Sequence, residues 1–294
     1  MFIPAVRSTR KLKIAVDGPA GAGKTIGALY LAAALAEGRR FACLDTEAGR
    51  ALAYADRVAF DHAPLAAPFT TARYLEALEG MKAGGYPVGV LDSLSHQWDG
   101  DGGILQRKEA ADVQGGNHFT NWGPFTKEYN KFREAIQQAP LHLVCTMRSK
   151  MTYAMEQGGK TTPKKIGMQP IQRDSFEYEF DIVFNVQMSH RATVSKDTTF
   201  LFDSANGEVY DLLDPAIGRR ILDWLNTAKP VPPSAKQRAT FAKILESTVW
   251  TTAEKDAYSK AETLILTGSD YQSMLDDLIA EGTKRKAADP GVGA

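Results

Sequence analysis

The chain has 294 residues, which is long enough for one large α/β domain with a smaller appendage. It carries 35 lysine and arginine residues and 35 aspartate and glutamate residues, so no overall field draws it to nucleic acid or membrane, and any polyanion site must be local. The two cysteines exclude a disulfide framework, and the five scattered histidines show no metal-ligand spacing.

The N-terminal stretch "MFIPAVRSTRKLK" lacks the apolar core of a secretory signal, and no run of 18 apolar residues occurs in the sequence. We therefore expect a cytoplasmic protein that makes no contact with a membrane.

Short apolar runs alternate with helical patterns from residue 13 to about residue 228, which is typical of βαβ units around a mainly parallel sheet. Strands are expected at residues 13–17, 41–45, 58–61, 88–92, 141–146, 181–187, 192–196 and 198–202. Helices are expected at residues 24–37 and 71–83, and along the apolar stripe of Phe125, Tyr129, Phe132 and Ile136. The predicted fold class is α/β, with a mainly parallel central sheet flanked by helices.

Two stretches, residues 99–123 and 149–178, match no regular element, and loops this long are uncommon unless they are functional or disordered. The proline-rich segment 229–236 reads as a linker between a core domain at 1–228 and a small helical appendage at 237–282. The tail at 283–294 is expected to be disordered.

Gly18, Gly23, Lys24 and Thr25 satisfy the pattern G-x-x-x-x-G-K-[ST] between an expected strand and an expected helix. In this motif the glycines let backbone amides surround phosphates, the lysine adds a full positive charge, and the hydroxyl binds magnesium. We therefore predict ATP and Mg²⁺ as cofactors. The residues expected to contact the nucleotide are Gly18, Pro19, Ala20, Gly21, Ala22, Gly23, Lys24, Thr25 and Ile26.

Polar side chains follow three of the other expected strands. Asp92 ends "VGVLD" and is expected to hold magnesium together with Thr25, although such an aspartate also suits an Asx turn or a helix cap. Glu47 follows "FACLD" and is expected to activate water, although a glutamate there also suits a helix dipole. Arg148 follows "LHLVCTM" and would contact the γ-phosphate or form a surface salt bridge. Glu47, Lys24 and Arg148 are the candidate catalytic residues.

The stretch "IAVDGPAGAGKT", residues 14–25, is similar to the phosphate loop of nucleoside monophosphate kinases that act on cytidylate. Those kinases continue with "LDTGAMYR", whereas this chain continues with "LDTEAGR" and has Glu47 where they have glycine. They also lack a strand that ends in Asp92-Ser93. A nucleoside monophosphate kinase is therefore an alternative function.

A wider set of motifs includes "VLDSLSHQWDGDGG", "GNHFTNW", "TMRSKMTY", "KKIGMQPIQRDSFEYEFD" and "HRATVSKDTT". Over about residues 10 to 226 the chain resembles phage-encoded, RecA-like AAA-family ATPases, some of which are grouped with the single-strand annealing proteins of phage recombination systems. The resemblance implies a RecA-like P-loop NTPase core with ATPase activity. It assigns nucleotide binding to Gly18–Thr25, magnesium to Asp92 and water activation to Glu47. Arg148 then stands where RecA has a glutamine that couples nucleotide to DNA, and arginine there is a departure from RecA.

The two irregular stretches would correspond to the DNA-binding loops of RecA. Residues 148–174 hold six lysines and arginines against two acidic residues, and the first stretch offers aromatic rings on which bases would stack. The candidate DNA-binding residues are Phe119, Trp122, Lys150, Tyr153, Lys160, Lys164, Lys165 and Arg173. Two alternatives stay open: the lysines solvate a loop, or Lys164, Lys165 or Arg173 reaches the γ-phosphate of a neighbouring protomer.

These features together predict an ATPase that assembles into rings or filaments with ATP at the protomer interfaces. It would bind single-stranded DNA, promote annealing or strand exchange, and work in the bacterial host cytoplasm with phage or host recombination proteins. A motor or loader that acts on a protein partner is the third possibility.

Overall fold

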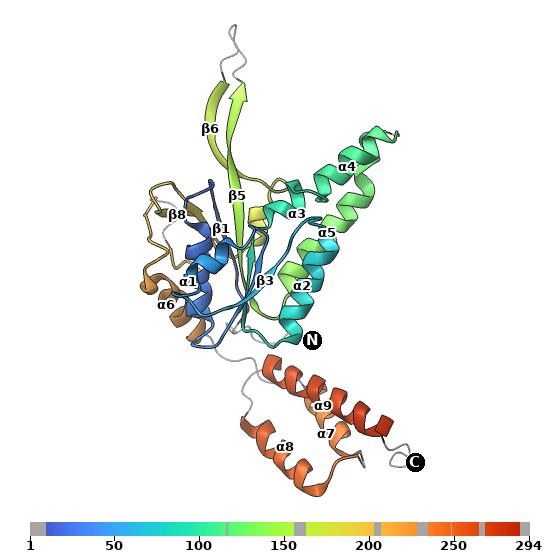
Figure 1. Cartoon of the computed structure of the whole chain (residues 1–294). Coiled ribbons are helices and arrows are strands. Elements are labelled where there is room, and N and C mark those ends of the chain that lie inside the picture. The colour runs from blue at the N-terminus through green and yellow to red at the C-terminus, as the bar shows by residue number, and fades with distance from the viewer. Residues whose placement is uncertain are drawn as a thin grey trace. The chain divides into compact units, whose positions relative to one another are not determined.

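The computed structural model describes residues 10–115, 117–155, 163–202, 207–227, 235–247, 249–264 and 268–288 (Figure 1). The chain divides into two compact units, residues 11–224 and a unit that includes residues 225–294. The first unit holds the sheet, and the second is built around helices α7 (Ala235–Leu245), α8 (Thr252–Leu264) and α9 (Gly268–Ala288).

The first unit is organised around one mixed, mainly parallel sheet. Its strands are β1 (Lys13–Gly18), β2 (Ala42–Asp45), β3 (Asp61–Pro64), β4 (Val88–Asp92), β5 (His142–Met155), β6 (Pro163–Pro170), β7 (Ile182–Val186) and β8 (Ala192–Asp197). They run in the order β3-β2-β4-β5-β1-β7-β8, with β6 beside β5. Only the β5–β6 and β7–β8 pairs are antiparallel among the described strands. The α/β fold predicted from the sequence is confirmed.

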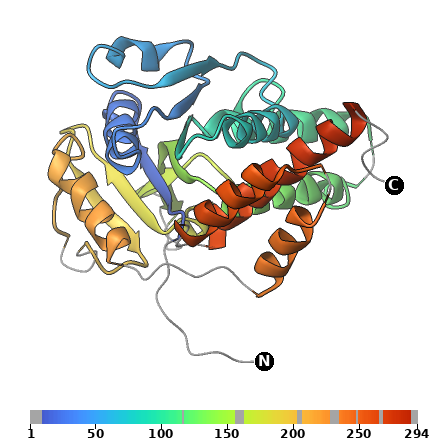
Figure 2. The same cartoon turned by 90° about the horizontal axis from the view of Figure 1, so that it is seen from below.

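Helices cover both faces of this sheet (Figures 1 and 2). Helices α1 (Lys24–Leu35) and α6 (Pro215–Asn226) share one face, and they pack so closely that a Cβ on Gly218 would lie 2.3 Å from the Ala34 Cβ. Helices α2 (Thr71–Ala83) and α5 (Trp122–Gln138) cover the other face, where the rings of Tyr74 and Phe132 pack edge to face at 5.8 Å. An apolar cluster lies on this face. The residues of β1 and β4 are buried throughout, as expected for strands covered on both faces.

The second unit has its own small apolar core. Phe241, Trp250, Tyr271, Leu275 and Leu278 are buried together. Helix α9 continues to Ala288, so residues 283–288 are helical and the prediction of a disordered tail was wrong for them.

The two stretches expected to be irregular contain regular structure. Residues 99–123 include the end of α3 (Ser95–Asp99), all of α4 (Ile104–Val113) and the start of α5. Helix α4 buries Ile104 and packs Leu105 partly against the core, and an ion pair of Arg107 with Glu128 joins it to α5. These few contacts leave no apolar stripe along the helix in the sequence.

In the second stretch, β5 continues to Met155 and pairs with β6, and the 3₁₀ helix η2 (Phe176–Glu179) follows. Figure 1 shows this hairpin projecting beyond the carboxyl ends of the other strands. Because the strand leaves the core there, burial no longer imposes a recognisable pattern on its sequence.

Three other boundaries differ from the predicted ones. Strand β3 lies at Asp61–Pro64 rather than 58–61, because Val58 and Phe60 are buried in the turn that leads into it. Residues 198–202 form no strand, since the Asp197 carboxylate accepts hydrogen bonds from the backbone of Thr199 and Phe202 and holds a turn. Helix α1 ends at Leu35 rather than residue 37.

Candidate functional site

The loop between β1 and α1 requires glycine at specific points. A Cβ on Gly18 would lie 2.3 Å from the Val186 carbonyl oxygen, so no other residue fits there without movement of the backbone. Gly21 and Gly23 have φ of 84° and 91°, in the left-handed region, and Gly23 directly precedes helix α1. A glycine-rich turn that opens into a helix N-terminus is suited to bind an anion through backbone amides.

Lys24 begins helix α1 and folds back over this loop. Its Nζ donates a hydrogen bond to the Pro19 carbonyl at 2.8 Å, and the residue is buried. Burial lowers the pKa of Lys24, and the carboxylates of Asp92 and Glu47 oppose that shift. A cation held in this way is available to phosphate oxygens.

Asp92 lies at the carboxyl end of β4, and strand β5 separates it from β1. Its carboxylate accepts a hydrogen bond from the Thr25 hydroxyl at 2.8 Å and a second from Thr146 on the intervening strand. Burial raises the pKa of Asp92, and the two hydroxyls oppose the rise. The sheet order thus brings Thr25 and Asp92, the two predicted magnesium ligands, into contact.

Their oxygen atoms suit a hard cation such as Mg²⁺. In the parts of the chain that the structure describes, no group of three histidine, cysteine, aspartate or glutamate side chains is placed to hold a metal ion. Magnesium at this site would therefore depend on Thr25, Asp92 and phosphate oxygens, which is how it is commonly bound in phosphate-transferring enzymes.

Glu47 is positioned by a tight turn after β2. The Asp45 carboxylate accepts hydrogen bonds from the backbone N–H of Glu47 at 2.7 Å and of Ala51 at 3.0 Å. The ring of His62 lies 3.2 Å from the same carboxylate. Asp45 therefore fixes the turn that directs Glu47 towards the loop.

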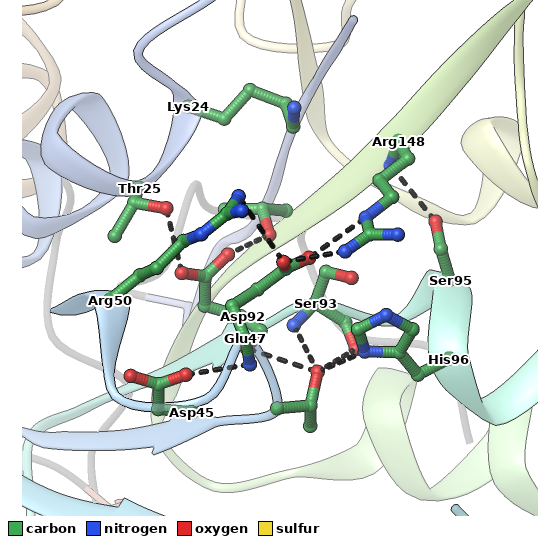
Figure 3. Close-up of polar contacts among 12 residues, drawn as sticks. Lys24, Thr25, Asp45, Glu47, Arg50, Asp92, Ser93, Ser95, His96 and Arg148 are labelled. Carbon is green, nitrogen blue, oxygen red and sulfur yellow. Dashed lines mark hydrogen bonds and ion pairs between the residues drawn. The ribbon is translucent and has the colours of Figure 1, made fainter. Parts of the chain in front are cut away.

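Glu47 and Arg148 form a bidentate ion pair (Figure 3). Arg148 donates from Nε to Oε1 at 2.9 Å and from a terminal nitrogen to Oε2 at 2.5 Å, while Arg50 stands 3.6 Å from Oε2. The Arg148 backbone N–H is itself bound to Ser95 Oγ at 2.9 Å. Burial alone would raise the pKa of Glu47, but the Arg148 guanidinium lowers it below the usual range.

A group of polar residues that the sequence did not predict lies beneath this pair. Thr46 Oγ1 accepts the Ser93 N–H at 2.8 Å and lies 2.7 Å from His96 Nδ1. Burial lowers the pKa of His96, and the nearby Arg148 charge lowers it further. The sequence signal for this group was the run "SLSH" directly after β4. Its contacts with the end of β2 depend on the order of the strands in the sheet.

Lys24, Thr25, Glu47, Asp92 and Arg148 line a pocket of about 410 Å³, within the range of about 300–1,000 Å³ typical of ligand sites. Arg50, Ala53 and Tyr54 of the 3₁₀ helix η1 (Arg50–Tyr54) line one part of the pocket. His190, Leu212 and Leu213 line another, and Ile26 also reaches it. The pocket thus combines charged and hydroxyl side chains with aromatic and aliphatic ones.

The predicted DNA-binding residues lie in different settings. Phe119 is 83% exposed between α4 and α5, and Lys150 is exposed on β5. Trp122 is instead half-buried and stacked on Trp98 with ring centroids 6.1 Å apart, so its position is that of a packing residue. Arg173 lies over the Tyr129 ring at 5.0 Å. Lys160 and the side chains of Tyr153, Lys164 and Lys165 lie outside the described residues.

Among the described helices, none is both long and apolar enough to cross a membrane. A search of curated proteins finds no match to this chain. Residues 10–229, which include the whole pocket, match the family described as AAA domain. The chain therefore belongs to the AAA domain family of P-loop ATPases.

Proposed function

We propose that this protein hydrolyses Mg-ATP, assembles into rings or filaments with ATP at the protomer interfaces, and binds single-stranded DNA. Its biological role would be annealing or strand exchange in phage recombination. The observation that carries the proposal is the Glu47–Arg148 ion pair, which joins the candidate water-activating residue to the strand that leads into the β5–β6 hairpin.

The roles follow from where the side chains lie. The Lys24 ammonium and the glycine-rich loop would hold the phosphates, and Thr25 with Asp92 would hold Mg²⁺. Magnesium would neutralise charge that develops on the phosphate oxygens. Glu47 would orient the attacking water, a role that requires a free carboxylate oxygen.

Arg148 occupies both Glu47 oxygens in the structure, and this contact suggests how hydrolysis is controlled. The γ-phosphate is a strong competitor for a guanidinium, because it offers more negative charge and a similar bidentate geometry. ATP would draw Arg148 away, which frees Glu47 and places a cation on the transferred phosphoryl group.

The same residue connects the pocket to the hairpin. Arg148 pairs with Gly18 of the phosphate loop strand, and the next residue, Ser149, pairs with Pro170 of β6. A shift of Arg148 would therefore be transmitted to the hairpin, where Lys150 is exposed. Lys160, Lys164 and Lys165 belong to the same segment and would add positive charge along a DNA strand.

Exposed Phe119 between α4 and α5 supports a second contact with DNA, because an aromatic ring open to solvent offers a surface on which a base stacks. A motor that acts on a protein partner would use the same ATP chemistry. Membership of the AAA domain family favours both over a nucleoside monophosphate kinase.

Glu47→Gln tests the ATPase. We expect it to bind ATP within about twofold of the wild type and to lose hydrolysis by about 10²- to 10⁴-fold, the usual contribution of a general base. Glu109→Gln, at an exposed position on α4, is the matched control and should hydrolyse normally. Normal hydrolysis by Glu47→Gln would refute the catalytic assignment.

A titration of single-stranded DNA at several salt concentrations, with and without an ATP analogue, tests the partner. Affinity should fall steeply with salt, and Phe119→Ala should weaken it by about tenfold, the loss of one stacked base. Salt-insensitive or absent binding would exclude the recombinase role and leave the motor or loader.

A further inference from the structure

The backbone of His190, in the turn between β7 and β8, has an unusual conformation. Its N–H donates to the Gln187 carbonyl at 2.9 Å, and the Gln187 N–H donates to the Arg191 carbonyl at 2.8 Å. The φ of His190 is 61°, in the left-handed region that residues other than glycine rarely adopt. Residues held in this region cluster at ligand sites, where the surrounding structure maintains the strain. The turn therefore marks the His190 side chain as a candidate for function, and the proposed ATPase mechanism does not use it.

The ring of His190 contacts the phosphate loop through one nitrogen. Nδ1 lies 3.0 Å from the Ala22 carbonyl oxygen, and a Cβ on Gly23 would lie 3.2 Å from Nδ1. Because a carbonyl oxygen only accepts, Nδ1 carries the proton of this hydrogen bond. In a neutral imidazole the other nitrogen, Nε2, is then an acceptor. Among the residues that the structure describes, none is hydrogen bonded to Nε2, so this atom is available to a ligand.

His190 and Leu212 form one wall of the nucleotide pocket. The His190 ring lies against Gly23, and a Cβ on Gly27 would lie 3.1 Å from the Leu212 Cβ. Gly23 and Gly27 are four positions apart, which is about one turn at the start of α1, so the wall follows the helix away from the loop. Since the phosphates would occupy the loop itself, this wall is left for the base of the nucleotide.

The other residues in this part of the pocket suit the flat faces of a base. Leu213, Ala53 and Tyr54 line it and offer apolar and aromatic surface, which accepts every base because every base has a π-face. Discrimination between bases therefore depends on a polar group that reads the edge of the ring. Arg50 offers donors only and stands 3.6 Å from Glu47, whereas His190 offers an acceptor.

We propose that His190 selects adenine by accepting a hydrogen bond at Nε2 from the exocyclic amino group of the base. Guanine carries a carbonyl oxygen at the corresponding position, so two acceptors would face each other. The Nδ1 contact with Ala22 fixes the tautomer and links the base contact to the phosphate loop. This inference rests on the proposed binding of ATP and adds the residue that reads its base.

Purine riboside triphosphate tests the inference, because it differs from ATP only in lacking the amino group. The wild type should bind ATP about tenfold more tightly than this analogue, which is the loss expected for one hydrogen bond. Calorimetric titration with each nucleotide measures the two affinities.

His190→Asn should bind both nucleotides with the same affinity. Asparagine keeps a donor for the Ala22 carbonyl and tolerates a left-handed backbone, but it has no counterpart of Nε2. His190→Gly also fits this backbone and should lose the preference for ATP in the same way. His118→Asn, at an exposed histidine outside the pocket, is the control and should keep the wild-type preference.

A preference for ATP that is as strong in His190→Asn and His190→Gly as in the wild type would overturn the inference. It would also be overturned by a wild type that binds the two nucleotides equally. A third nucleotide, dATP, separates the base from the sugar: a penalty for dATP that both variants abolish, with an unchanged preference for ATP over the analogue, would assign His190 to the ribose hydroxyl instead. Failure of the wild type to bind any of the three nucleotides would contradict the proposed function.

Discussion

The two ends of strand β1 both bury charged groups, but they treat them differently. At the amino end, the Lys13 ammonium donates to the Ala139 carbonyl at 2.8 Å and to the Leu141 carbonyl at 2.7 Å. His142 Nδ1 accepts the Leu12 N–H at 3.0 Å, and the Asp181 carboxylate accepts the Lys13 N–H at 2.9 Å. The polar groups at this end satisfy one another within the fold.

At the carboxyl end, the polar groups face pockets. Lys24, Asp92 and Glu47 surround the nucleotide pocket, and Asp17 lines a second pocket. The Ser93 hydroxyl is buried there without a hydrogen-bond partner. Because buried polar groups reduce stability unless they are paired, the polar groups that line the nucleotide pocket indicate that a bound ligand satisfies them. We therefore assign the polar residues at the amino end of β1 to stabilising the fold, and those at its carboxyl end to binding.

Lys13 and Lys24 are the buried lysines on which the two ends of β1 can be compared directly, by replacing each with methionine. Lys24→Met should lower ATP affinity by about 1,000-fold, because it removes the only full charge of the phosphate loop. Its free energy of unfolding should stay within about 1 kcal/mol of the wild type. Calorimetry of binding and urea denaturation measure the two quantities.

Lys13→Met should lower the free energy of unfolding and leave the affinity for ATP unchanged. It leaves the Ala139 and Leu141 carbonyls without their buried donor and should cost about 4 kcal/mol of stability. ATP affinity of the folded fraction should be unchanged. Lys82→Met, at an exposed ion pair with Glu79, is the control and should cost less than about 1 kcal/mol. A Lys13→Met protein as stable as the wild type would contradict the assignment of this end to stability.

Lowering the pH should reduce the stability of the folded protein through His142, which lies at the amino end of β1. Burial, with the charges of Lys11 and Lys13, lowers the pKa of His142 to about 3, so the unfolded chain binds its proton first as the pH falls. Between pH 7 and pH 4 this residue should cost about 3 kcal/mol of stability. The measurement is the change in unfolding free energy relative to His142→Asn, which keeps an acceptor for the Leu12 N–H. Parallel curves for the two proteins would rule out this contribution.

Asp17 should show the opposite sign over the same pH interval. Burial raises its pKa to about 6, so the folded protein keeps a proton that the unfolded chain has released. Stability should therefore fall by about 2 kcal/mol from pH 4 to pH 7 relative to Asp17→Asn. Chemical denaturation of both proteins at the two pH values provides the test. A curve for the wild type that rises relative to Asp17→Asn would mean that a cation pairs with Asp17 in the folded protein.

Local patterns were enough to predict much of the fold. The apolar runs of β1, β2 and β4 and the stripe of α5 were found because burial imposes periodicity on the sequence. The hairpin β5–β6 and helix α4 were missed, since neither depends on an apolar stripe for its position. The phosphate loop was found because its glycines and lysine are contiguous.

An α/β chain with a phosphate loop and polar residues at several strand ends follows from local patterns in the amino-acid sequence. Which of those residues meet follows from the order of the strands in the folded sheet. Glu47 and Arg148 lie 101 positions apart, and their contact depends on β4 standing between β2 and β5. The contact of Asp17 with Asn185, 168 positions away, likewise depends on β7 standing next to β1. Spacing along a chain fixes local geometry, whereas contacts between strands depend on the order in which the sheet is assembled.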